Sequence, residues 1–179
     1  MLQHLMLMLV VAPVLVWVRP PRRMICPPAA AWALFCGVIL VWHIPAVYRW
    51  TMGGGLRQVL MQFCFLGAAL AFWSVVLVPE RRRQLGPPGM ALYVLAAALV
   101  TGLPGALIAF ARHPLYVAAP LCATPAYVRV LADQQLAGLI MWIPMDLVLF
   151  SVALALFGAA LRAPDAGQGR RLSERRTVR

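Results

Sequence analysis

Residues 136–161 read LAGLIMWIPMDLVLFSVALALFGAAL, an apolar run in which Asp146 is the only charged side chain. A helix that crosses about 30 Å of hydrocarbon needs about 20 consecutive apolar residues. A soluble domain of this size has no way to bury such a run on every side. The run therefore predicts a transmembrane helix and an all-α fold.

Four further apolar runs precede this one, separated by segments rich in proline, glycine and arginine. The five predicted spans cover residues 2–18, 29–48, 56–78, 90–111 and 136–161. The chain of 179 residues is 63% hydrophobic and only 12% charged, and its mean hydropathy is +0.84. We therefore expect a polytopic membrane helix bundle of about five spans over residues 1–161, followed by a basic tail over 162–179.

Arginine supplies all 16 basic side chains and gives the chain a net charge of +11. Three arginines follow the first run, three follow the third and six lie in the tail, whereas the two intervening segments carry two each. Cytoplasmic loops are enriched in basic residues, so this distribution places the N-terminus outside and the C-terminus in the cytoplasm. Membrane orientation thus accounts for the basic charge, and nucleic acid is not an expected partner.

The predicted topology places all three histidines, His4, His43 and His113, at or near the outer leaflet. Imidazole and methionine thioether together suit copper, particularly Cu(I). Methionine is also ordinary packing material in apolar helices, and packing is the better interpretation of each methionine taken singly. The candidate metal ligands are His4, Met8, His43, Asp133 and Met141, and the other candidate polar residues are Gln3, Gln62, His113, Gln134 and Asp146.

Asp146 lies inside the last apolar run, where an unpaired carboxylate is unfavourable unless it is neutral or has a partner. Prolines at positions 13, 45, 104 and 144 interrupt four of the runs. Kinked helices and an intramembrane carboxylate also occur in transporters, which leaves copper or proton transport as an alternative. No catalytic motif is present in the sequence, so an enzyme is not expected.

Several motifs resemble the polytopic CtaG-type cytochrome c oxidase assembly factors. Residues 3–8 and 12–13 are similar to that family's Q-H-x-L-x-M and A-P elements, and residues 42–48 to its W-H-x-P-x-x-Y. Phe65 and Phe72-Trp73 fit its third helix, and residues 133–144 resemble its D-Q-x-x-G-x-x-M-W segment, with one more residue before Gly138. The resemblance implies a multi-pass protein of the bacterial inner membrane that helps a haem–copper oxidase mature, around copper supply. Its implied partners are the lipid bilayer, oxidase subunits and other assembly factors.

Two departures from the family pattern bear on the site. The family usually has further helices before the Gln-His motif, at which this chain begins, and it tends to carry Glu-His where this chain has Met61-Gln62. An amide is a poor copper ligand, so one expected ligand is replaced. Beside the assembly factor and the transporter, two alternatives stay open: a structural membrane partner without metal, and a b-type haem protein that uses His4 and His43.

Overall fold

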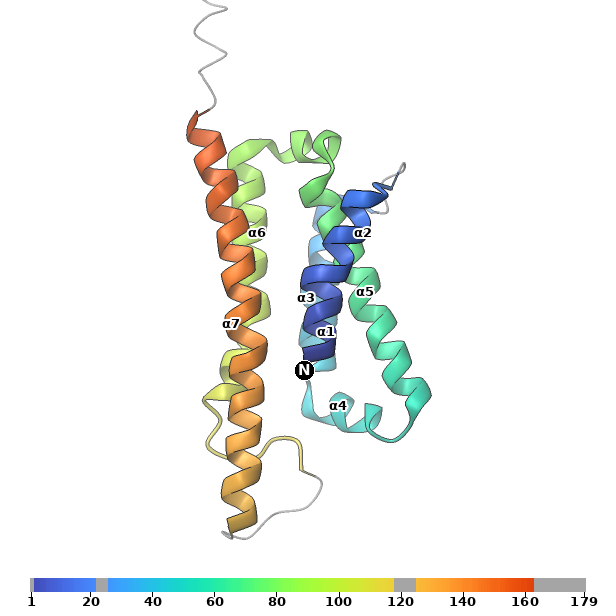
Figure 1. Cartoon of the computed structure of the whole chain (residues 1–179), viewed down its shortest axis with the longest axis vertical. Helices are drawn as coiled ribbons and strands as arrows, with labels where there is room; N and C mark the ends of the chain where they lie inside the picture. Colours follow the sequence, from blue (N-terminus) through green and yellow to red (C-terminus); the bar gives the residue numbers. More distant parts are fainter. Residues whose placement is uncertain (1, 22–25, 118–124, 163–179) are drawn as a thin grey trace, which may run out of the picture.

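The computed structural model of the chain describes residues 2–21, 26–117 and 125–162, and over these residues it contains helices and no strand (Figure 1). The helices are α1 (Leu2–Met6), η1 (Leu7–Val11), α2 (Ala12–Val18), α3 (Pro28–Trp42), α4 (Pro45–Thr51), α5 (Gly55–Leu77), α6 (Pro79–Ala109) and α7 (Pro125–Arg162). The predicted all-α fold is confirmed. The predicted basic tail lies outside the described residues, apart from Arg162, which ends α7.

The first three elements form one continuous rod with a single π-helical turn, η1, in its middle. Pro13 has no backbone N–H, and its ring would crowd the carbonyl four residues earlier, so the wider turn accommodates it. In this turn the Ala12 N–H donates to the Leu7 carbonyl and leaves the Met8 carbonyl free. The indole N–H of Trp73 donates to that carbonyl at 2.7 Å, which ties the rod to α5.

A sharp break separates α3 from α4. Ile44 precedes Pro45, and a residue before proline is driven out of the helical region; its φ and ψ are −62° and 126°. Pro45 then begins α4, because proline is favourable in the first helical turn. The axes of α3 and α4 are bent by 78° relative to each other, and α4 lies across one end of the bundle (Figure 1).

The second half of the chain is dominated by the long pair α6 and α7, which stand side by side (Figure 1). Gly86, with φ +66°, breaks α6 near its start, so that the arginine-rich first turns lie at an angle to the rest of the helix. Further along, a Cβ added at Gly138 of α7 would lie 2.6 Å from the Ala109 nitrogen and 2.8 Å from the Gly105 carbonyl oxygen of α6. Glycine therefore lets the two backbones touch, as small residues do in membrane helix pairs.

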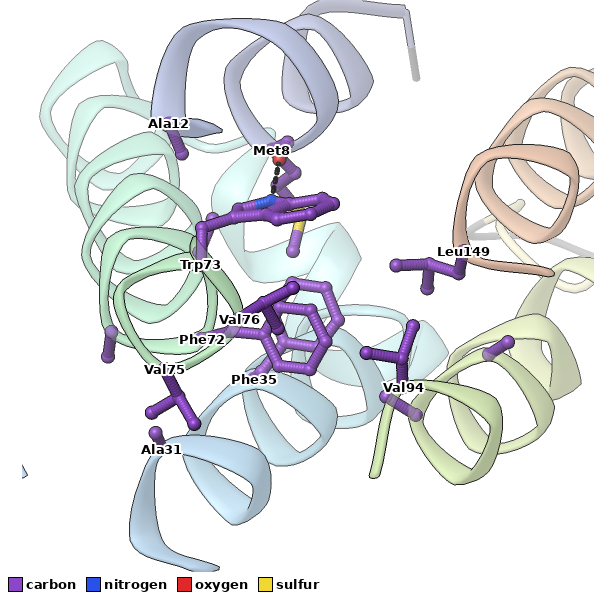
Figure 2. Packing of buried hydrophobic residues seen from close by; sticks show 14 of the residues in the cluster. Met8, Ala12, Ala31, Phe35, Phe72, Trp73, Val75, Val76, Val94 and Leu149 are labelled. Carbon is purple, nitrogen blue, oxygen red and sulfur yellow. Dashed lines mark hydrogen bonds between the residues drawn. The ribbon is translucent and has the colours of Figure 1, made fainter. Parts of the chain in front are cut away.

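An aromatic core joins the two halves of the molecule. Phe35 of α3 stacks on Phe72 of α5 with ring centroids 4.2 Å apart. Figure 2 shows this pair beneath Trp73, with Val94 of α6 and Leu149 of α7 reaching toward it. Because these side chains are fully or almost fully buried, the core fixes the rod, α3 and α5 against the α6–α7 pair.

Three helices, α5, α6 and α7, are long and apolar enough to cross a membrane, and the bent pair of α3 and α4 counts as a fourth crossing if it is one broken span. All five predicted runs are helical, but residues 2–18 form a shorter apolar helix, and residues 29–48 do not form a straight span. Large apolar side chains such as Leu107 (69% exposed) and Leu154 (71% exposed) cover the outside of α6 and α7. The chain is therefore an all-α membrane helix bundle. Over the described residues it has fewer straight transmembrane helices than the five apolar runs predict.

Candidate metal centre

A small cavity of about 60 Å³ lies where α1, the α3–α4 bend and the first turns of α5 meet. A cavity of this size has room for an ion or a few water molecules but not for an organic cofactor. Over the part of the chain that the structure describes, its lining combines imidazole, amide, thioether and aromatic groups and contains no carboxylate. The lining residues are Gln3, His4, Trp42, His43, Tyr48, Met52, Gln58, Met61, Gln62 and Phe65.

His43 is positioned by the break between α3 and α4. It is the C-cap of α3 and only 7% exposed, and its Nδ1 lies 2.7 Å from the Ile39 carbonyl oxygen. A carbonyl oxygen can only accept, so Nδ1 is the nitrogen that carries the proton and donates. In the neutral ring this leaves a lone pair on Nε2, the arrangement that orients histidine as a metal ligand through its second nitrogen.

His4 comes from α1 and is 5% exposed. Its ring stacks on Phe65 with centroids 5.0 Å apart, and its buried Nε2 has no hydrogen-bond partner among the described residues. A buried polar atom without a partner is unfavourable by about 1–3 kcal/mol, so its presence calls for an explanation. A bound ligand in the cavity would supply the missing partner.

The two imidazoles are close enough to share an ion. Their ring centroids lie 5.4 Å apart at an interplanar angle of 70°. An ion about 2 Å from a ligating nitrogen lies about 3 Å from the ring centroid, so two rings that share it have centroids no more than about 6 Å apart. The structure thus brings together two of the predicted ligands, His4 and His43, in the lining of one cavity.

A third donor comes from α5. Met61 lines the cavity and is 6% exposed, and next to it the buried Oε1 of Gln62 has no hydrogen-bond partner among the described residues. Over the same part of the chain, no three His, Cys, Asp or Glu side chains are grouped as they would be around a metal ion. A closed four-ligand zinc site is therefore not what these residues build. Two imidazoles and one thioether are instead the donor types that suit Cu(I).

Tyr116 holds α4 in place over the cavity. Its hydroxyl donates to the His43 carbonyl oxygen at 2.9 Å, and its ring meets Tyr48 edge-on with centroids 4.8 Å apart. Burial, and secondarily the neighbouring Tyr48, raises the pKa of Tyr116 to about 12, so the hydroxyl keeps its proton at any physiological pH. The Thr51 hydroxyl donates to the Tyr48 carbonyl at 2.6 Å and stiffens the same turn.

The other predicted metal ligands do not line this cavity. Met8 is fully buried in the hydrophobic core, Met141 is buried on α7 at 2% exposure, and Asp133 is exposed on α7. Among the predicted polar residues, Gln3 and Gln62 do line it. The site that the structure assembles is therefore smaller than the predicted one and lies on α1, α3 and α5.

Gln134 and His113 make contacts that hold the segment after α6. The Leu115 N–H donates to Gln134 Oε1 at 2.6 Å, and Gln134 Nε2 donates to the His113 carbonyl at 3.3 Å. The exposed His113 ring is 2.9 Å from the Tyr127 hydroxyl. These contacts place the segment that carries Tyr116, so both residues support the cavity indirectly.

Asp146 lies at the contact between α6 and α7. Its Oδ2 accepts the Trp142 indole N–H at 2.6 Å, and a Cβ on Gly102 of α6 would come within 2.8 Å of the same oxygen. Its buried Oδ1 has no hydrogen-bond partner among the described residues. The carboxylate is thus directed at a neighbouring helix, away from the histidine cavity.

Comparison with protein families identifies the class of this bundle. Residues 17–163 match the family model described as cytochrome c oxidase caa3 assembly factor (Caa3_CtaG). The chain belongs to this family, whose description names an assembly role and not a reaction. The matched range includes His43, Met61 and Gln62 and begins after His4. Searches of curated proteins and of solved structures give no match.

Proposed function

We propose that this assembly factor holds Cu(I) between His4, His43 and Met61 and passes it to a haem–copper oxidase during maturation. The observation that carries the proposal is a pair of buried imidazoles that face one small cavity, with the His4 Nε2 lacking any described partner. The metal is cargo here: the chain binds and releases it, and no bond of an organic substrate is made or broken.

Charge favours a monovalent ion. Among the described residues no carboxylate lines the cavity, so a divalent cation would bring two uncompensated charges into this buried site. Cu(I) brings one charge, and its soft character suits a thioether beside two imidazoles. These residues fit copper better than they fit zinc, magnesium or calcium.

We propose further that the cavity serves the outer leaflet of the bacterial inner membrane. The arginines at positions 81–83 lie at the α5–α6 connection, and Arg162 ends α7 at the same end of the molecule (Figure 1). The positive-inside rule assigns that end to the cytoplasm. The α3–α4 bend with His43 lies at the opposite end, where a bound ion can meet an oxidase subunit on the outer side.

The test is a deletion strain complemented with single variants and grown under copper limitation. We expect deletion to lower haem–copper oxidase activity without changing oxidase transcript levels, and added copper to restore part of it. His43→Ala should reproduce the deletion, and His43→Met should retain more activity because a thioether is also a soft ligand. His113→Ala is the matched control, because His113 is exposed and does not line the cavity.

Normal oxidase activity in the deletion strain under copper limitation would contradict the proposal. A copper-transport defect with normal oxidase activity would favour the transporter alternative. Equal loss in His43→Ala and His43→Met, with protein levels unchanged, would instead assign the imidazole to a structural hydrogen bond.

A further inference from the structure

Two methionines of the described residues line the cavity, and they differ in how far they are exposed. Met61 is 6% exposed, whereas Met52 is 55% exposed although it borders the same small space as His4 and His43. Met52 contributes little to the core, because more than half of its side chain is exposed. Its position is that of a group at the mouth of the cavity.

The local sequence holds Met52 at this position. It is the C-cap of α4 and is followed by Gly53 and Gly54, and a Cβ added at Gly54 would meet nothing within 4 Å. The end of α4 is nevertheless fixed, because Arg57 donates to the Trp50 carbonyl at 3.1 Å and its guanidinium lies 4.7 Å from the centre of the Trp50 ring. Met52 is thus a flexible thioether on a fixed support.

We infer that Met52 is the exchange ligand through which Cu(I) enters and leaves the cavity, an inference that rests on the proposed function. A Cu(I)–sulfur bond to Met52 forms as the bond to a sulfur or nitrogen ligand of the donor breaks, and the ion then passes to Met61 and the two imidazoles. Copper stays Cu(I) throughout, and no proton or electron is transferred. The ion therefore never has to become a free aqueous species, and the partner that this mouth fits is a carrier with soft ligands.

A ligand that binds only during transfer stabilises the transition state of both directions and leaves the equilibrium unchanged. Removing it should slow loading and unloading by the same factor and leave the dissociation constant as it was. A resident ligand behaves differently, because its removal weakens binding and speeds release. The ratio of the loading rate to the unloading rate therefore distinguishes an exchange ligand from a resident ligand: substitution of an exchange ligand leaves this ratio unchanged, and substitution of a resident ligand lowers it.

The experiment uses the full chain in detergent micelles with Cu(I)–bicinchoninate as donor and bathocuproine disulfonate as acceptor, followed by stopped-flow absorbance. We expect Met52→Leu to slow both transfers by about tenfold, the effect of a modest loss of transition-state stabilisation. Met6→Leu is the matched control, because Met6 is 49% exposed on α1 and does not line the cavity. It should transfer copper at the wild-type rates.

The possible outcomes separate the inference from the proposed function. Wild-type protein that binds no Cu(I) would overturn both. Protein that binds Cu(I) normally, while Met52→Leu exchanges it at the wild-type rate, would overturn the inference alone. Faster release with weaker binding in Met52→Leu would also overturn it, because Met52 would then be a resident ligand.

Discussion

Replacing Gly138 by alanine should force α6 and α7 apart. The new Cβ would lie 2.6 Å from the Ala109 nitrogen, 2.8 Å from the Gly105 carbonyl oxygen and 3.0 Å from the Ala109 Cα. All three are backbone atoms, so no side chain can rotate away to make room. Overpacking of this kind typically destabilises a fold by about 1–3 kcal/mol.

Gly158 offers a matched control on the same helix, because a Cβ there would meet nothing within 4 Å. Both substitutions gain about 1 kcal/mol from the better helix propensity of alanine, so this contribution cancels when they are compared. We expect Gly158→Ala to be neutral or stabilising and Gly138→Ala to be less stable than Gly158→Ala by about 1–3 kcal/mol.

The Gly138→Ala substitution should also loosen the packing around the histidine cavity. Gln134 lies one turn before Gly138 on α7 and accepts the Leu115 N–H, next to Tyr116, whose hydroxyl holds the His43 carbonyl. Moving α7 away from α6 therefore loosens the support of α4. We expect Gly138→Ala to release bound Cu(I) faster than Gly158→Ala does.

Unfolding of both variants in mixed micelles, followed by tryptophan fluorescence, measures the difference in stability. Equal midpoints for Gly138→Ala and Gly158→Ala would refute the close backbone contact between α6 and α7. A loss of stability in Gly138→Ala without any change in copper release would refute only the link from this contact to the cavity.

Four further predictions follow from individual contacts. Trp73→Phe leaves a buried carbonyl without its donor and should lower the free energy of unfolding by about 1–3 kcal/mol, measured in the same micelles. Tyr116→Phe removes the hydrogen bond that holds α4 and should raise the rate of Cu(I) release without abolishing binding. Asp146→Asn keeps an oxygen acceptor for the neighbouring indole, so oxidase activity in cells should stay normal; a defect in copper or proton transport in this variant would support the transport alternative. Reporter fusions should read cytoplasmic after Arg83 and periplasmic after Pro114, and a cytoplasmic result after Pro114 would refute the predicted orientation.

Periodicity and composition predict most of this fold because lipid imposes simple requirements. Apolar runs must form helices to satisfy their own backbone hydrogen bonds, and every predicted run does so. The break after Trp42 is harder to place, because Pro45 could equally have kinked a continuous span. Pro45 accounts for the extended conformation of Ile44, but the size of the bend, 78°, also depends on how α4 packs over the cavity, which is a tertiary effect.

The candidate site likewise contains residues that the sequence predicts and residues that only the tertiary structure reveals. His4 and His43 were predicted as ligands because the predicted topology brings the histidines to the outer leaflet and imidazole suits copper, and the structure places both rings on one cavity. Met8 was also a predicted ligand, but it lies in the hydrophobic core and does not line the cavity. The sequence does not predict that Met61 and Met52 line this cavity, because their positions depend on where α5 and the end of α4 meet α1.

X-ray absorption at the copper edge of the Cu(I)-loaded full chain tests the central claim most directly. One equivalent of Cu(I) should bind, with two imidazole nitrogens and one thioether sulfur in its first coordination shell. His43→Ala should remove one nitrogen, and Met61→Leu should remove the sulfur. A copper shell without imidazole nitrogen, or one unchanged in both variants, would contradict the claim that His4, His43 and Met61 form the copper site.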